Sequence, residues 1–72
     1  MLKSYLKQLL EDIKSLFNVG NKTLFRILLD EYKTKLMNIQ SKETLNSEHV
    51  KIIKQIYIVI KQLDGTLSSN VI

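Results

Sequence analysis

The segment Val50–Leu63 most strongly limits what this chain can fold into, because its apolar residues recur at helical spacing. At about 100° per residue, one broad apolar face collects Val50, Ile52, Ile53, Ile56, Tyr57, Val59, Ile60 and Leu63. A narrower opposite stripe without a carboxylate collects Lys51, Lys54, Gln55, Lys61 and Gln62. Ile58 stands in the middle of that polar stripe. A helix this apolar needs neighbours on more than one side, so we expect it to be the central helix of a small bundle.

Two earlier segments have the same periodicity, and together the three predict an all-α protein with a compact three-helix bundle. The bundle is expected to fill one domain, residues 1–65, with helices over residues 2–18, 22–38 and 47–63. The run Ile56–Ile60 is strand-like in composition, but the spacing of the apolar residues around it favours a helix. Residues 66–72 lack a pattern and are predicted to form a flexible tail.

The residues between these segments carry signals for helix starts and ends. Asn21 is a suitable N-cap for the second helix, and Asn46 or Ser47 for the third. Gly20 and Gly65 each stand where a helix is expected to end, and both are predicted to adopt the left-handed conformation that closes a helix.

The inventory of reactive side chains predicts a protein that is not an enzyme and that needs no cofactor or metal. The 72 residues include no Cys and one His, so neither a disulfide nor a thiolate metal site can form. His49 is expected to be a surface or capping residue, because one imidazole makes no catalytic constellation. The neighbouring carboxylates Glu11 and Asp12, like Asp30 and Glu31, point about 100° apart on a helix and do not converge on a metal.

The absence of Cys, of a membrane-span pattern and of a signal-peptide pattern predicts a protein of the cytoplasm or another reducing intracellular compartment. We expect no membrane partner and no small-molecule substrate. The longest apolar run is far shorter than the roughly 20 residues of a membrane span, and Lys7, Glu11 and Asp12 interrupt any signal-peptide core. The formal net charge is +4. A basic balance favours anionic partners, although it is equally expected of a surface that only keeps the protein in solution.

Two sets of surface residues are candidate binding sites. Lys51, Lys54 and Lys61 lie within about 80° on the third helix and can follow phosphates, or they can simply be solvated. Three apolar residues depart from the buried arcs of their helices and indicate a protein interface or self-association, namely Ile27, Met37 and Ile58. The three tyrosines all fall on apolar faces, which disfavours recognition of single-stranded bases by stacking.

Three stretches resemble a known family: Leu10–Lys14, Asn18–Leu28 and Leu45–Val50, the last followed by Ile53-Lys54. Their order is similar to the helical domain shared by YqeY-like proteins and the C-terminal tail of the GatB subunit of glutamyl-tRNA amidotransferase. The chain departs from that family at Ile56–Ile60, where the family has a charged segment, and we expect no counterpart of the helical subdomain that follows there. The resemblance implies a helical accessory module associated with tRNA or a tRNA-modifying complex. RNA contacts carried over from it are Arg26, Lys33, Lys51 and Lys54, to which the lysine stripe adds Lys61.

Two hypotheses for function follow from these residues. The first is a non-catalytic helical binding module, associated with tRNA as the resemblance implies. The second is a small interaction subunit or inhibitor that docks on a protein partner through the exposed apolar residues of the third helix, above all Ile58.

Overall fold

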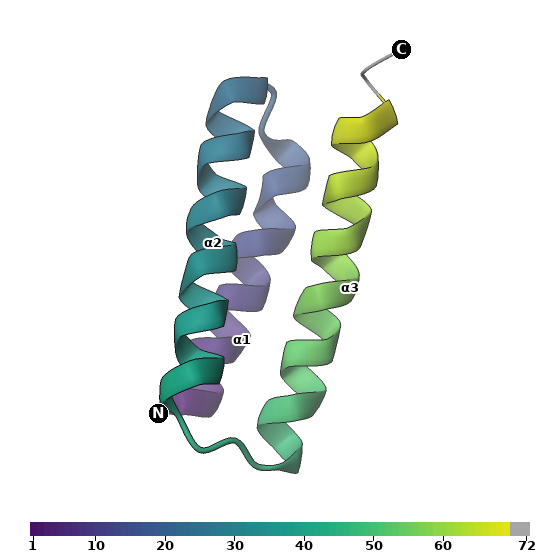
Figure 1. Cartoon of the computed structure of the whole chain (residues 1–72). Helices are drawn as coiled ribbons and strands as arrows, with labels where there is room; N and C mark the ends of the chain where they lie inside the picture. The colour runs from purple at the N-terminus through teal and green to yellow at the C-terminus, as the bar shows by residue number, and fades with distance from the viewer. Residues whose placement is uncertain (70–72) are drawn as a thin grey trace.

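Three helices and one short 3-10 turn account for nearly all of the chain. The computed structural model describes residues 1–69 and the side chains of residues 1–66. In order, the elements are α1 (Leu2–Lys14), η1 (Ser15–Asn18), α2 (Lys22–Lys42) and α3 (Ser47–Ser69). They run up, down and up beside one another in a bundle of 40 × 19 × 17 Å (Figure 1). The predicted all-α fold and three-helix architecture are confirmed.

Asparagine side chains start α2 and α3, as predicted. The Asn21 Oδ1 accepts a hydrogen bond of 3.0 Å from the backbone N–H of Leu24. The Asn46 Oδ1 accepts one of 2.9 Å from the backbone N–H of His49. His49 returns the interaction, because its Nδ1 accepts from the backbone N–H of Asn46 at 3.2 Å. The only histidine therefore takes the place that Glu or Gln holds in a capping box.

The first helical segment ends at Asn18 as predicted, but the predicted C-terminal ends of the second and third helices are wrong. The first helix tightens into η1 over its last turn instead of continuing as α-helix to Asn18. The second continues to Lys42, because Gln40 and Lys42 are good helix formers and the Ser41 hydroxyl donates to the Asn38 carbonyl at 3.0 Å. The third passes through Gly65 to Ser69, so residues 66–69 of the predicted flexible tail are helical. Residues 70–72 lie outside the described part of the chain.

Neither glycine closes a helix in the predicted way. Gly20 and Gly65 both lack a positive φ. Gly20 lies in the connection before α2, where Val19 is already extended and its N–H donates to the Leu16 carbonyl at 3.1 Å. Gly65 is an interior residue of α3, so it contributes no left-handed turn there.

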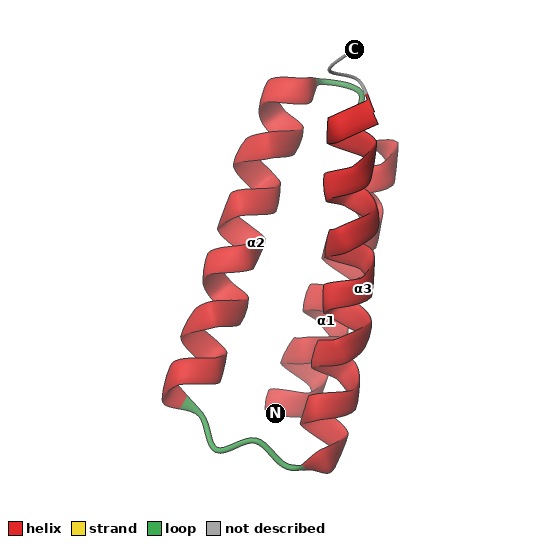
Figure 2. Cartoon of the chain, turned by 45° about the vertical axis from the view of Figure 1, so that its right-hand side comes forward, coloured by secondary structure: helices red, strands yellow, loops and turns green. Residues whose placement is uncertain are grey.

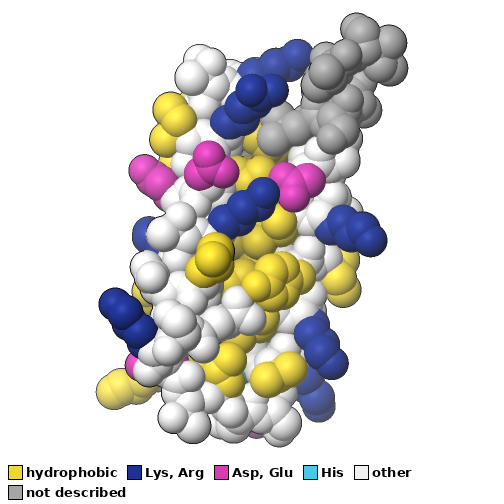
Figure 3. Space-filling view, in the orientation of Figure 1, with side chains coloured by type: hydrophobic (Ala, Val, Ile, Leu, Met, Phe, Trp, Pro, Cys, Tyr) yellow, Lys and Arg dark blue, Asp and Glu magenta, His cyan; other side chains and the backbone are white. Residues whose placement is uncertain are grey.

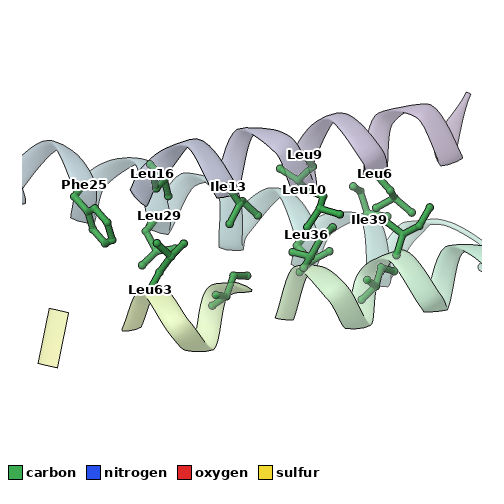
Figure 4. Packing of buried hydrophobic residues seen from close by; sticks show 14 residues of the cluster. Leu6, Leu9, Leu10, Ile13, Leu16, Phe25, Leu29, Leu36, Ile39 and Leu63 are labelled. Atoms are coloured by element: carbon green, nitrogen blue, oxygen red, sulfur yellow. The ribbon is translucent and has the colours of Figure 1, made fainter. Parts of the chain in front are cut away.

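The core is a single cluster of aliphatic side chains and one Phe (Figure 4), and no polar side chain among the described residues is buried in it. Its buried members are Leu6, Leu9, Leu10, Ile13, Leu16, Phe25, Leu29, Leu36, Ile39, Ile52, Ile53, Ile56, Ile60 and Leu63. Tyr5, Val50 and Tyr57, which were predicted to lie on apolar faces, are in fact exposed, and so are Phe17 and Leu24. They stand at the edges of their apolar arcs or in the 3-10 turn, and two neighbouring helices cover only the middle of each arc.

The three helices are not equally close. The backbones of α1 and α3 approach each other along much of their length, whereas α2 lies farther from both (Figure 2). The wider spacing leaves the boundary between α2 and α3 partly open at the surface. No helix in the described residues is long and apolar enough to cross a membrane.

Candidate binding surfaces

An apolar groove runs between α2 and α3, the two helices whose backbones are farther apart. It includes a hollow of about 150 Å³, lined by Lys33, Leu36, Met37, Tyr57 and Ile60. Hydrophobic side chains fill the strip between α2 and α3 in Figure 3. The groove is therefore open to solvent and has mostly hydrophobic walls.

Two polar contacts bridge the groove between α2 and α3. The Lys33 Nζ lies 3.0 Å from the Asp64 Oδ1 and 3.3 Å from its Oδ2. About two helical turns farther along α2, the Tyr57 Oη donates to the Gln40 Oε1 at 2.6 Å. Both contacts are partly exposed, so each adds at most about 1 kcal/mol. Their main consequence is to fix the positions of the Lys33 and Tyr57 side chains at the groove.

Lys33 is not the solvent-facing residue that the sequence predicts. Its ion pair with Asp64 holds its ammonium group against α3, and its side chain is only about one-third exposed. A phosphate at this position would have to compete with the Asp64 carboxylate. Arg26, also predicted to contact RNA, is exposed, but it lies on α2 and not on the helix that carries Lys51, Lys54 and Lys61.

The outer face of α3 combines basic side chains with one apolar side chain. Lys51, Lys54 and Lys61 are exposed, and Ile58 is 59% exposed. Because α3 is continuous here, their spacing of three, four and three residues places all four on one stripe about 15 Å long. In the described part of the chain, ion pairs form at Lys3–Glu48 and Lys33–Asp64. The three lysines of the stripe therefore have no carboxylate partner among residues 1–66.

The three predicted interface residues are exposed as expected, but they do not form one patch. Ile27 is 52% exposed, Met37 66% and Ile58 59%. Met37 lines the groove. Ile27 is ten residues earlier on α2, which places it about 15 Å along the axis and about 80° around it. Ile58 lies on the outer face of α3, so the sequence predicted the exposure of these side chains but not their separation.

The placement of all three tyrosines on covered apolar faces is wrong for Tyr5 and Tyr57. Tyr5, Phe17 and Tyr57 are each about half exposed. Tyr5 also lines a hollow of about 320 Å³ where the start of α1 meets the end of α2. Tyr32 is more covered, and the Lys35 ammonium lies 5.6 Å from its ring centroid, within cation–π range. The signal for exposure was the position of Tyr5 and Tyr57 at the edge of an apolar arc.

The carboxylates and the histidine occupy separate places. Among the described residues, no group of three His, Asp or Glu side chains could hold a metal ion. His49 is engaged in the N-cap of α3. Asp12 accepts a hydrogen bond of 3.0 Å from the Gln8 amide one turn earlier on α1.

Comparison of the chain with protein-family models, with curated proteins and with solved structures found no match. The resemblance to YqeY-like proteins and the GatB tail therefore stays a prediction from the three stretches of sequence that carry it.

Proposed function

We propose that this chain is a non-catalytic helical binding module that docks the outer face of α3 on an acidic surface of a protein partner. One observation carries the proposal: Ile58 is 59% exposed at the centre of a stripe of lysines that have no carboxylate partner in the described residues. Such a stripe is self-repelling and partly apolar. A partner surface with an apolar side chain flanked by carboxylates would neutralise the lysines and bury Ile58.

The apolar centre favours a protein over a nucleic acid. Protein interfaces typically have a buried apolar centre and a polar rim. Complete burial of an Ile side chain is worth about 1.5–3 kcal/mol, and the lysines around it would steer an acidic partner and set its register. Phosphate groups would meet the lysines equally well, but they offer nothing that Ile58 can pack against.

The test is affinity capture from extract of the source cells, with bound proteins and RNA identified for each variant. The variants are Ile58→Ser and Ile27→Ser, which remove an equally exposed isoleucine from α3 or from α2. Helicity and thermal unfolding are measured first for each variant, and both are expected to match the unmodified chain. We expect a protein that is bound by the unmodified chain and by Ile27→Ser, and lost with Ile58→Ser. Capture that does not depend on Ile58, or no captured protein, would overturn the proposal.

A second candidate function is the association with tRNA that the YqeY and GatB resemblance implies. Lys51, Lys54 and Lys61 support it, because they have no carboxylate partner among residues 1–66, lie on one stripe and can contact successive phosphates. Neutralising three phosphates would give a slope of about −2 to −3 in the logarithm of affinity against the logarithm of salt concentration.

RNA binding is tested by titrating bulk tRNA at several salt concentrations. Lys51→Glu/Lys54→Glu/Lys61→Glu should weaken binding and flatten the salt dependence. The matched control reverses three exposed lysines of α2, Lys22, Lys35 and Lys42, with the same change of net charge. Ile58→Ser should leave RNA binding intact, which separates this candidate from the first. Absence of binding by the unmodified chain at low salt would refute it.

A further inference from the structure

The outer face of α2, like that of α3, has an exposed isoleucine beside charged side chains, but on α2 the charges one turn from the isoleucine are negative. Ile27 is 52% exposed. Asp30 and Glu31 follow it by three and four residues, so they flank it on either side one turn along the helix. Both carboxylates are exposed, and neither forms an ion pair or hydrogen bond within the described part of the chain.

On α3 the flanking residues of the central isoleucine are basic. Lys54 precedes Ile58 by four residues and Lys61 follows it by three, which places both within one turn of it. Lys51 extends the basic stripe one turn farther towards the start of the helix. Each isoleucine is therefore an exposed apolar centre with charged residues one turn away, which are acidic on α2 and basic on α3. On α2 the exposed Arg26 and Lys35 stand one turn from Asp30 and Glu31, respectively.

We propose that copies of this chain associate head to tail, with the outer face of α3 of one copy packed on the outer face of α2 of the next. The contact would place Ile58 against Ile27 and bring Lys54 and Lys61 near Asp30 and Glu31. It rests on the proposed function, because it uses the same α3 face and gives it an acidic partner surface of the required kind. The two faces cannot meet within one copy, because each points away from the shared core.

The symmetry of this contact has a consequence for the assembly. The two surfaces belong to different helices, so the contact is heterologous, and each copy joined at one face keeps the other face free. The assembly therefore grows with protein concentration or closes into a ring. Its charged border makes the association weaker at high salt.

The first measurement is sedimentation velocity of the purified chain over a wide range of concentrations at low and high salt. At low salt we expect the weight-average mass to rise above the monomer mass of 8.4 kDa as concentration increases. It should return towards 8.4 kDa at high salt. A mass that stays monomeric throughout would overturn the proposal.

The second measurement swaps the charges of the two faces. Lys54→Glu/Lys61→Glu makes both faces acidic, and Asp30→Lys/Glu31→Lys makes both basic, so each variant alone should be monomeric. Mixed in equal amounts, the two variants should associate again, because each then offers a face opposite in charge to one on the other. Lys7→Glu/Lys14→Glu on α1 is the control of equal charge change, and it should leave the association unaltered. Variants that associate alone, or a mixture that stays monomeric, would contradict the proposed contact.

The same variants separate this inference from the proposed function. Asp30→Lys/Glu31→Lys leaves the α3 face intact, so it should still capture the protein partner from extract while losing self-association. A monomeric chain with capture that depends on Ile58 would overturn only the head-to-tail contact. Self-association that depends on Ile58, without capture of any other protein, would overturn the docking on a different protein and leave the head-to-tail contact standing.

Discussion

Replacing Gly65 with Ala should stabilise the bundle, and the sign of the effect tests where α3 ends. Gly65 lies inside α3 without a positive φ, and a Cβ placed on it meets nothing within 4 Å. Ala restricts the unfolded chain and has the higher helix propensity, by about 1 kcal/mol in a helix interior. If Gly65 instead ended the helix in the left-handed conformation, the same substitution would be strained and would destabilise the protein.

The expected gain is smaller than the full difference in propensity. Gly65 is four residues before Ser69, the last residue of α3, and the last turn of a helix frays. We therefore expect Gly65→Ala to add about 0.5 kcal/mol to the free energy of unfolding. For a domain of this size, that raises Tm by about 2–4 °C.

Thermal and urea unfolding followed by circular dichroism at 222 nm measure this change. The control is Gln62→Ala, an exposed substitution one turn earlier on α3, which should change stability by no more than about 0.5 kcal/mol. Both samples are compared at one low protein concentration, so that association does not contribute. A lower Tm for Gly65→Ala would mean that α3 ends at Gly65, and it would refute the extension of the helix to Ser69.

Five further substitutions probe the cap, the core, the outer face of α3 and the groove. Asn46→Ala should lower the free energy of unfolding in urea by about 1 kcal/mol, because the N-cap of α3 is lost. His49→Glu should change it little, because a glutamate can also accept from the Asn46 N–H. Ile56→Ala should lower the free energy of unfolding by about 2–5 kcal/mol, since the side chain is 0% exposed. Ile58→Ala in dilute protein should change it by no more than about 0.5 kcal/mol. Tyr57→Phe should cost about 0.5 kcal/mol by removing the exposed bond to Gln40; a loss above about 2 kcal/mol would contradict that exposure.

The helices and most of the core were predictable because their signals are local. Apolar residues at helical spacing placed Ile53, Ile56 and Leu63 in the core, where the structure has them. Asn side chains at the start of α2 and α3 were equally readable, because N-capping involves residues three apart. The C-terminal ends of α2 and α3 could not be predicted in the same way. Polar residues after Ile39 and the glycine at position 65 lower the preference for a helix but do not forbid one.

The surface contacts were less predictable than the helices, because they depend on the register between helices. The bonds Tyr57–Gln40 and Lys33–Asp64 join residues 17 and 31 positions apart. Spacing along one helix predicted that Ile27, Met37 and Ile58 would be exposed, but it says nothing about their positions relative to one another. The groove beside Met37 arises from the distance between α2 and α3, which no single segment encodes.

The exposed isoleucines tie the stability of this bundle to its association. A chain of about 60–70 residues buries only about 60% of the surface that its unfolded form exposes, so each apolar side chain left in water matters. The outer faces around Ile27 and Ile58 exist only when α2 and α3 are formed, so anything that covers them stabilises the folded state alone. At a concentration ten times Kd, a bound copy adds about 1.4 kcal/mol, more than the gain expected from Gly65→Ala. Tm should therefore rise with protein concentration at low salt and lose this dependence in Ile58→Ser. A Tm that is equal in dilute and concentrated protein would mean that the two faces stay uncovered between copies.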